Sequence, residues 1–134
     1  MKFKLTFITL FAVALGGCAG MNTERLPDVA SHIELVGVSS PKLIVRTPEL
    51  RSKASRLELD GVVERAFGAG TTGRTHLTIS FYDRTGQILQ SDETDFAPSN
   101  LNAYRRSVFH RGSYSFPITA LPTGTTRIEV RAHE

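Results

Sequence analysis

The sequence contains a single cysteine, Cys18, among its 134 residues, so no disulfide can form within the chain. A small domain without disulfides depends on its hydrophobic core for stability. The residues after position 17 are enough for one domain, and a chain of that length buries roughly two-thirds of the surface that its extended form exposes. The scarcity of cysteine therefore predicts one domain that folds on its core alone.

Long apolar runs are also lacking. The run from Leu5 to Leu15 has eleven residues, whereas a helix that crosses a bilayer needs about 20. A retained transmembrane helix is therefore not expected here. An excess of one charge is missing as well. The formal net charge is +3, and it falls to +1 if Lys2 and Lys4 are removed with an N-terminal signal peptide, as argued below. A balance so close to neutral gives no basis for nucleic-acid binding, and we expect no nucleic-acid partner.

Motifs of catalysis and metal binding are missing too. The chain has no Gly-x-Ser-x-Gly nucleophile elbow, and its histidines lack the close spacing and the acidic or cysteine neighbours of metal sites. The acidic run Asp92-Glu93-Thr94-Asp95 lacks the glycine and the ligand rhythm of an EF-hand, so we expect a solvated turn there. We predict no metal, no cofactor and solvated surface positions for the four histidines, His32, His76, His110 and His133.

One glycine-rich stretch, Gly68-Ala69-Gly70-Thr71-Thr72-Gly73, satisfies the pattern G-x-G-x-x-G. In dinucleotide-binding folds this pattern holds a pyrophosphate at the N-terminus of a helix. Here the residues that follow alternate with period two, which is typical of a strand. A flexible hairpin loop is therefore the better interpretation.

The N-terminus has the three zones of a secretory signal peptide: a basic start, the apolar run and the small pair Gly16-Gly17. Leu15-Gly16-Gly17-Cys18 resembles the lipobox of bacterial lipoproteins, with leucine three positions before the cysteine and small residues between them. This resemblance implies that residues 1–17 are cleaved off. It also implies that Cys18 carries diacylglycerol on its thiol and an acyl chain, such as palmitate, on its freed amine. Two or three acyl chains make a stable anchor, whereas one is marginal.

The lipobox resemblance also predicts domain boundaries and location. Residues 18–30 would be the lipidated cysteine and a polar tether, and residues 31–134 the folded domain. Because an Asp after the cysteine tends to retain Gram-negative lipoproteins in the inner membrane, Ala19 indicates the periplasmic face of the outer membrane. A Gram-positive source would change that location, and the alternative for Cys18 is a free thiol in a signal cleaved elsewhere. With Cys18 attached to lipid, no cysteine nucleophile remains, and we expect no enzyme.

Alternating apolar and polar residues, with Gly and Pro between them, predict about seven short strands. Such a pattern without long helical periodicity favours an immunoglobulin-like antiparallel β-sandwich. Between Ser99 and Gly112, a short helix capped by Ser99 competes with a loop and strand. The expected strand segments are Ile33–Val38, Leu43–Val45, Arg56–Phe67, Thr75–Tyr82, Gln87–Gln90, Tyr114–Ile118 and Thr126–Glu134.

The segment from Leu77 to Leu89 resembles the hairpin of FxLYD-type immunoglobulin-like domains, which occur in bacterial surface proteins and lipoproteins. In that pattern an aromatic-rich strand ends in Tyr-Asp before a glycine turn, as Tyr82-Asp83 and Gly86 do here. Ile79 and Phe81 stand where the pattern has Phe and Leu. The resemblance implies a non-catalytic interaction or spacer module and transfers no site residues.

Basic residues are unevenly placed along the chain. One cluster falls within residues 42–56, where Glu49 is the only acidic residue, and a second lies beside Tyr104 and His110. Since arginine presents a planar fork that suits phosphate and carboxylate, we take the second cluster as a candidate site for an anionic partner. The alternative is that these are solvated edges that discourage sheet-to-sheet pairing. The first cluster comprises Lys42, Arg46, Arg51, Lys53 and Arg56, and the second Arg105, Arg106 and Arg111.

These observations predict a non-catalytic lipoprotein whose β-sandwich is an interaction, adaptor or envelope-assembly module. Its expected partners are the membrane, through lipid on Cys18, and an envelope protein or an anionic cell-wall or lipid component. The alternative is a small-ligand or metal-binding periplasmic lipoprotein. A ligand binder should show a concave pocket with converging polar groups, whereas an adaptor should show an exposed sheet edge or a flat apolar patch.

Overall fold

A computed structural model describes residues 30–101 and 110–134 of the chain. These residues contain eight strands and one turn of 3₁₀ helix, η1 (Ala30–His32), and no α-helix, which confirms the all-β prediction. The strands are β1 (Glu34–Val38), β2 (Leu43–Val45), β3 (Glu49–Lys53), β4 (Arg56–Arg65), β5 (His76–Tyr82), β6 (Ile88–Thr94), β7 (Arg111–Ile118) and β8 (Arg127–His133).

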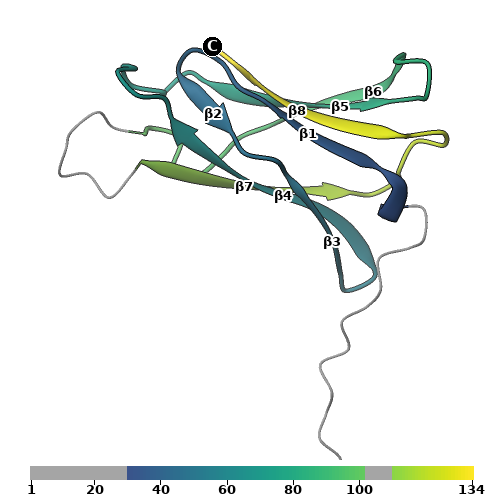
Figure 1. Cartoon of the computed structure of the whole chain (residues 1–134). Helices are drawn as coiled ribbons and strands as arrows, with labels where there is room; N and C mark the ends of the chain where they lie inside the picture. Colours follow the sequence, from purple (N-terminus) through teal and green to yellow (C-terminus); the bar gives the residue numbers. More distant parts are fainter. Residues whose placement is uncertain (1–29, 102–109) are drawn as a thin grey trace, which may run out of the picture.

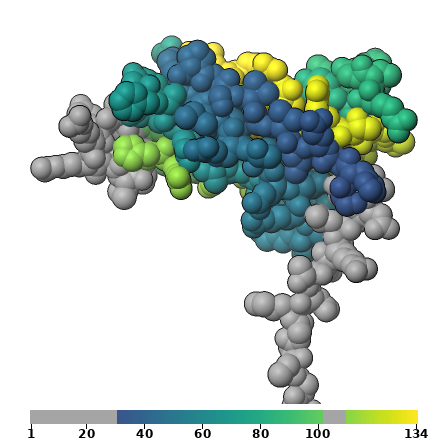
Figure 2. Space-filling view, in the orientation of Figure 1, coloured from purple at the N-terminus to yellow at the C-terminus, as the bar shows by residue number. Residues whose placement is uncertain are grey.

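The strands form two sheets that pack as a sandwich. Sheet A has the order β1-β8-β5-β6, and sheet B has β4 at its centre with β2 and β3 along one edge and β7 along the other. Figure 1 views the sandwich from its edge, with β5, β6 and β8 in the upper layer and β3, β4 and β7 in the lower one. In the space-filling view, β1 and the β2–β3 segment cover this near edge (Figure 2).

Two features of the sheets differ from the sequence prediction. β1 pairs with β8 in parallel, from Glu34 opposite Arg127 to Val38 opposite Arg131, so sheet A is mixed and not wholly antiparallel. β3 was not expected, because its alternate residues are charged or polar and hide the strand pattern. It forms a hairpin with β4 through Ala54 and Ser55, both with positive φ, as tight two-residue hairpin turns require.

The core lies between the sheets and follows from the period-two alternation. In β4, Leu59 and Val63 are fully buried while Arg56 and Val62 on the opposite face are exposed. Sheet A contributes Leu77, Ile79 and Phe81 from β5 and Ile128, Val130 and Ala132 from β8. The remaining buried core residues are Leu43, Val45, Leu50, Phe96, Leu101, Tyr114 and Ile118.

The turn between β5 and β6 is the predicted one. The Asp83 carboxylate accepts hydrogen bonds from the backbone N–H of Thr85 at 2.8 Å and of Gln87 at 2.9 Å, and Gly86 has φ of 84°. A further hydrogen bond from the Thr85 hydroxyl is the main reason that the pKa of Asp83 is lowered. The turn is therefore held by its own side chains, as Asp-initiated turns commonly are.

The acidic run after this turn was wrongly predicted as a solvated turn. Asp92 and Thr94 lie within β6 and pair with Ile79 and Leu77 of β5. Gln90 and Asp92 are joined by a hydrogen bond of 2.6 Å. Since β6 is an edge strand, its polar inner face discourages further strand pairing, which explains why a strand here lacks the expected apolar pattern.

Candidate functional site

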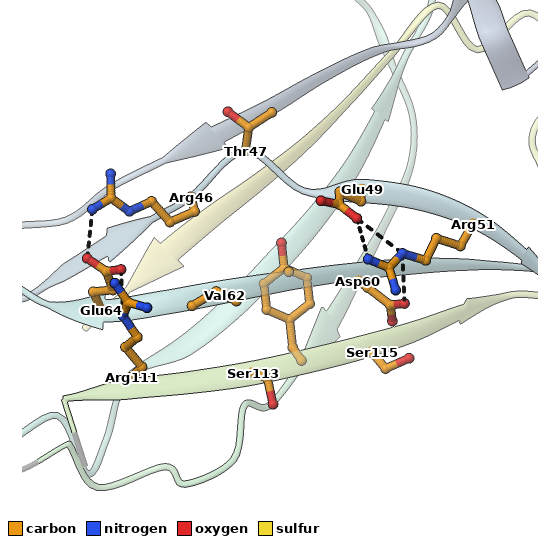
Figure 3. A pocket seen from close by; sticks show the side chains of 12 residues that line it. Arg46, Thr47, Glu49, Arg51, Asp60, Val62, Glu64, Arg111, Ser113 and Ser115 are labelled. Atoms are coloured by element: carbon orange, nitrogen blue, oxygen red, sulfur yellow. Dashed lines mark hydrogen bonds and ion pairs between the residues drawn. The ribbon is translucent and has the colours of Figure 1, made fainter. Parts of the chain in front are cut away.

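The outer face of sheet B carries a depression with a volume of about 710 Å³. β4 crosses its floor, and β7 and the β2–β3 segment flank it (Figure 3). The alternation of the strands places polar side chains here, because the intervening residues face the core. Cross-strand register sets Arg111 opposite Glu64, Ser113 opposite Val62 and Ser115 opposite Asp60.

One end of the depression is built on Glu64. Its Oε2 atom accepts a hydrogen bond from Arg46 at 2.8 Å, and its Oε1 atom forms an ion pair with Arg111 at 2.9 Å. The Glu64 side chain is only 17% exposed, whereas those of Arg46 and Arg111 are 59% and 72% exposed. The hydrogen bond from Arg46 is the main cause that lowers the pKa of Glu64. With two cations on one carboxylate, this end carries a formal charge of +1, and we call it the cationic end.

The other end has the opposite balance. Arg51 lies 2.5 Å from the Glu49 carboxylate and 4.0 Å from that of Asp60, so one cation faces two anions. Its formal charge is −1, and we call it the acidic end. Figure 3 shows the two ends at opposite sides of Val62, with the ion pairs drawn as dashed lines.

The floor between the ends is small and mixed. Val62 is exposed, and Ser113, Ser115 and Thr47 also line the depression. Buried Tyr114 lies across Gly61, and its hydroxyl has no hydrogen-bond partner among the described residues. Burial, and then the nearby Asp60 charge, raise the pKa of Tyr114, so it remains a neutral phenol. Among the described residues that line the depression, none is a histidine or a cysteine. The arginines and carboxylates at its two ends are groups that bind ligands of opposite charge.

The two basic clusters of the sequence differ in how their residues are paired with carboxylates and in how far the structure describes them. Lys42 pairs with Glu134 at 3.2 Å and Lys53 with Glu58 at 3.4 Å, while Arg46 and Arg51 pair as described above. The apparent excess of positive charge in residues 42–56 is therefore largely neutralised. Of the second cluster, Arg105 and Arg106 lie outside the described residues. Arg111 is brought against Arg46 of the first cluster through Glu64, which sequence reasoning did not single out.

Among the described residues, one pair of histidines is in contact. His76 and His133 are register partners whose rings stack with centroids 5.4 Å apart, and His76 lies 3.9 Å from Glu93. Within residues 30–101 and 110–134, no three His, Cys, Asp or Glu side chains gather as a metal site would require. His32 and His110 are exposed.

The glycine-rich stretch lies in the connection between β4 and β5, and a strand follows it in place of a helix, as expected. It is not the predicted hairpin loop, because β4 belongs to sheet B and β5 to sheet A, so the two strands do not pair. Buried Thr72 holds this loop: its hydroxyl donates to the Ser99 carbonyl at 3.0 Å and accepts from the Leu101 N–H at 2.8 Å. The loop therefore has a structural role in joining two connections across the end of the sandwich.

Cys18, the tether up to residue 29 and residues 102–109, where a helix competed with a loop, are outside the described part of the chain. Among the described residues, no helix is long and apolar enough to cross a membrane.

Comparison of the chain with protein-family models, with curated proteins and with solved structures finds no match in any of the three.

Proposed function

We propose that the chain is a lipid-anchored envelope protein whose β-sandwich is a non-catalytic docking module for an anionic envelope component or partner. Anchoring is supported by the signal-like N-terminus and by Leu15-Gly16-Gly17-Cys18. Docking is supported by the cationic end of the depression on sheet B. The anchor and the docking site are separable parts of the proposal, and each has its own test.

The observation that carries the docking proposal is the sharing of Glu64 by Arg46 and Arg111. Arg46 uses its Nη2 and Arg111 its Nε for this contact, which leaves the other guanidinium donors of each side chain unused by Glu64. Because both arginines contact the Glu64 carboxylate, their guanidinium groups are held in place before a ligand binds, and less side-chain freedom is lost on binding. An incoming carboxylate or phosphate can accept hydrogen bonds from both arginines.

The size of the depression also suits the alternative, a small-ligand-binding lipoprotein, because ligand pockets commonly have volumes of about 300–1,000 Å³. The exposed side chains of Ile88 and Leu89 on edge strand β6 are, in contrast, the kind of surface expected of an adaptor. Both alternatives place binding on surfaces of the sandwich, and neither requires a reaction.

The anchor is tested by acylation. Radiolabelled palmitate is expected to enter the wild-type chain and to be absent from Cys18→Ala, because the thiol is the attachment point that the lipobox provides. Ala19→Ser, which keeps the cysteine and a small neighbour, should label like the wild type. Equal labelling of wild type and Cys18→Ala would rule out the anchor.

The docking surface is tested by charge reversal. A photo-crosslinking amino acid at Val62 should capture a partner in intact envelopes, and Arg46→Glu with Arg111→Glu should reduce that product at least about fivefold, since two attractive contacts become repulsive. Arg84→Glu makes the same kind of substitution at one position on the exposed β5–β6 turn, outside the depression, and should leave the product unchanged. An undiminished product in the double variant would contradict docking at this face.

A further inference from the structure

Resting on the docking function proposed above, we infer that the depression on sheet B takes a short extended peptide with a carboxylate at one end and an ammonium group at the other. The carboxylate binds at the cationic end, between Arg46 and Arg111. The ammonium group binds at the acidic end, beside Asp60 and Glu49.

The charge pattern supports a ligand that carries both signs. A simple anion would use the cationic end alone and would meet the formal charge of −1 at the acidic end. Asp60 is the less satisfied of the two acids there, because its closest cation, Arg51, is 4.0 Å away and no described residue donates a hydrogen bond to it. A carboxylate in this state is available to a cationic group of the ligand.

The spacing of the ends matches a short extended peptide. Glu64 and Asp60 are four residues apart on the same face of β4, which corresponds to about 13 Å along the strand. A ligand held at both ends makes a hydrogen bond of about 3 Å at each, and two to three extended residues span about 7 to 10 Å. A single amino acid is too short to reach both ends, so the length distinguishes a peptide from a free amino acid.

The floor is suited to small side chains. Val62 is exposed midway between the ends and offers an apolar contact, while Ser113 and Ser115 place hydroxyls along β7 beside it. The volume of about 710 Å³ accommodates a short peptide without displacing either end. Peptides with alanine-sized side chains are therefore the appropriate probes.

The test uses the purified full-length chain and three peptides: trialanine, N-acetyltrialanine and trialanine amide. Binding is followed by calorimetry and by shifts of backbone amide signals. Trialanine is expected to bind about fivefold or more tightly than either capped form, since each cap removes one charged contact. The largest signal shifts are expected at residues 60–64 and 111–115.

Matched variants assign each cap to one end. Asp60→Asn with Glu49→Gln should abolish the preference for trialanine over its N-acetyl form, while Arg46→Gln with Arg111→Gln should abolish the preference over the amide. Arg84→Gln should change neither preference. All these positions are on the surface, and unfolding curves of each variant establish that the sandwich is retained.

Some outcomes would overturn the inference. Failure of trialanine to bind, equal binding of the N-acetyl form, or wild-type binding by the Asp60 and Glu49 variant each rules out a ligand of both charges. If one of these results is obtained but the crosslink at Val62 still depends on Arg46 and Arg111, the peptide ligand is ruled out. The docking function is then still supported, with an anionic partner. Loss of that crosslink dependence together with tripeptide binding would instead discard the macromolecular partner and keep the peptide site.

Discussion

Phe81→Ala is expected to lower the free energy of unfolding by about 3–5 kcal/mol, which is the usual cost of removing a buried aromatic ring. Phe81 is 1% exposed and pairs with Ile128 of β8 in the centre of sheet A. Two terms make up this loss: the free energy of transferring the ring out of water, which the variant no longer gains, and the cost of the cavity left between the two sheets. Because domains of this kind are stable by about 5–15 kcal/mol, a large part of the total would be lost.

Phe67 provides the matched control for this prediction. It is fully exposed in the connection after β4, so Phe67→Ala should change the free energy of unfolding by no more than about 0.5 kcal/mol. Both variants are measured by urea unfolding followed by circular dichroism. Similar losses in the two variants would mean that the packing of sheet A against sheet B is not as described.

Gly61→Ala is expected to destabilise the protein by about 3 kcal/mol, at the upper end of the range for overpacked cores. A Cβ atom at Gly61 would lie 2.2 Å from the Tyr114 hydroxyl oxygen and 2.3 Å from Cζ of the same ring. The ring is buried in the core and lies directly opposite Gly61 in the β4–β7 register, so it has little room to move aside. The glycine is required here by close approach of a side chain.

Gly70→Ala is the control for the clash. No atom lies within 4 Å of a Cβ built on Gly70, and the φ of Gly70 is outside the left-handed region. The stability of the Gly70→Ala variant should therefore be close to that of the wild type. Thermal unfolding of both variants gives the comparison. The clash would be refuted if Gly61→Ala melted within one degree of Gly70→Ala.

The strands with apolar alternation were predictable from the sequence. Leu59 and Val63 of β4 are four residues apart, and Ile79 and Phe81 of β5 are two apart, so the period of two alone assigns each pair to one buried face. The strands that differed from prediction, β3 and the second half of β6, lie at sheet edges. Their charged and polar residues are typical of edge strands and do not show the apolar alternation.

The candidate site was predictable only in part. The sequence pointed to clusters of basic residues, and Arg111 was among the residues singled out. It did not indicate that four of the five basic residues within 42–56 pair with carboxylates, or that Asp60 and Glu49 form a second end to the same depression. Glu64 carried no signal at all, because an acidic residue on the polar side of a strand is ordinary in a sequence.

The sequence by itself determined the all-β class, the positions of most strands and the absence of disulfides within the chain, and it is the basis of the proposed acylation at Cys18. These follow from local patterns and composition, which do not depend on how the strands are arranged. Only the tertiary structure decided that β1 adds to β8 in parallel and that Arg46 and Arg111 meet at Glu64. Strand pairing is set by packing between segments distant in the chain, so the charges that face one another appear only when β4 lies between β2 and β7.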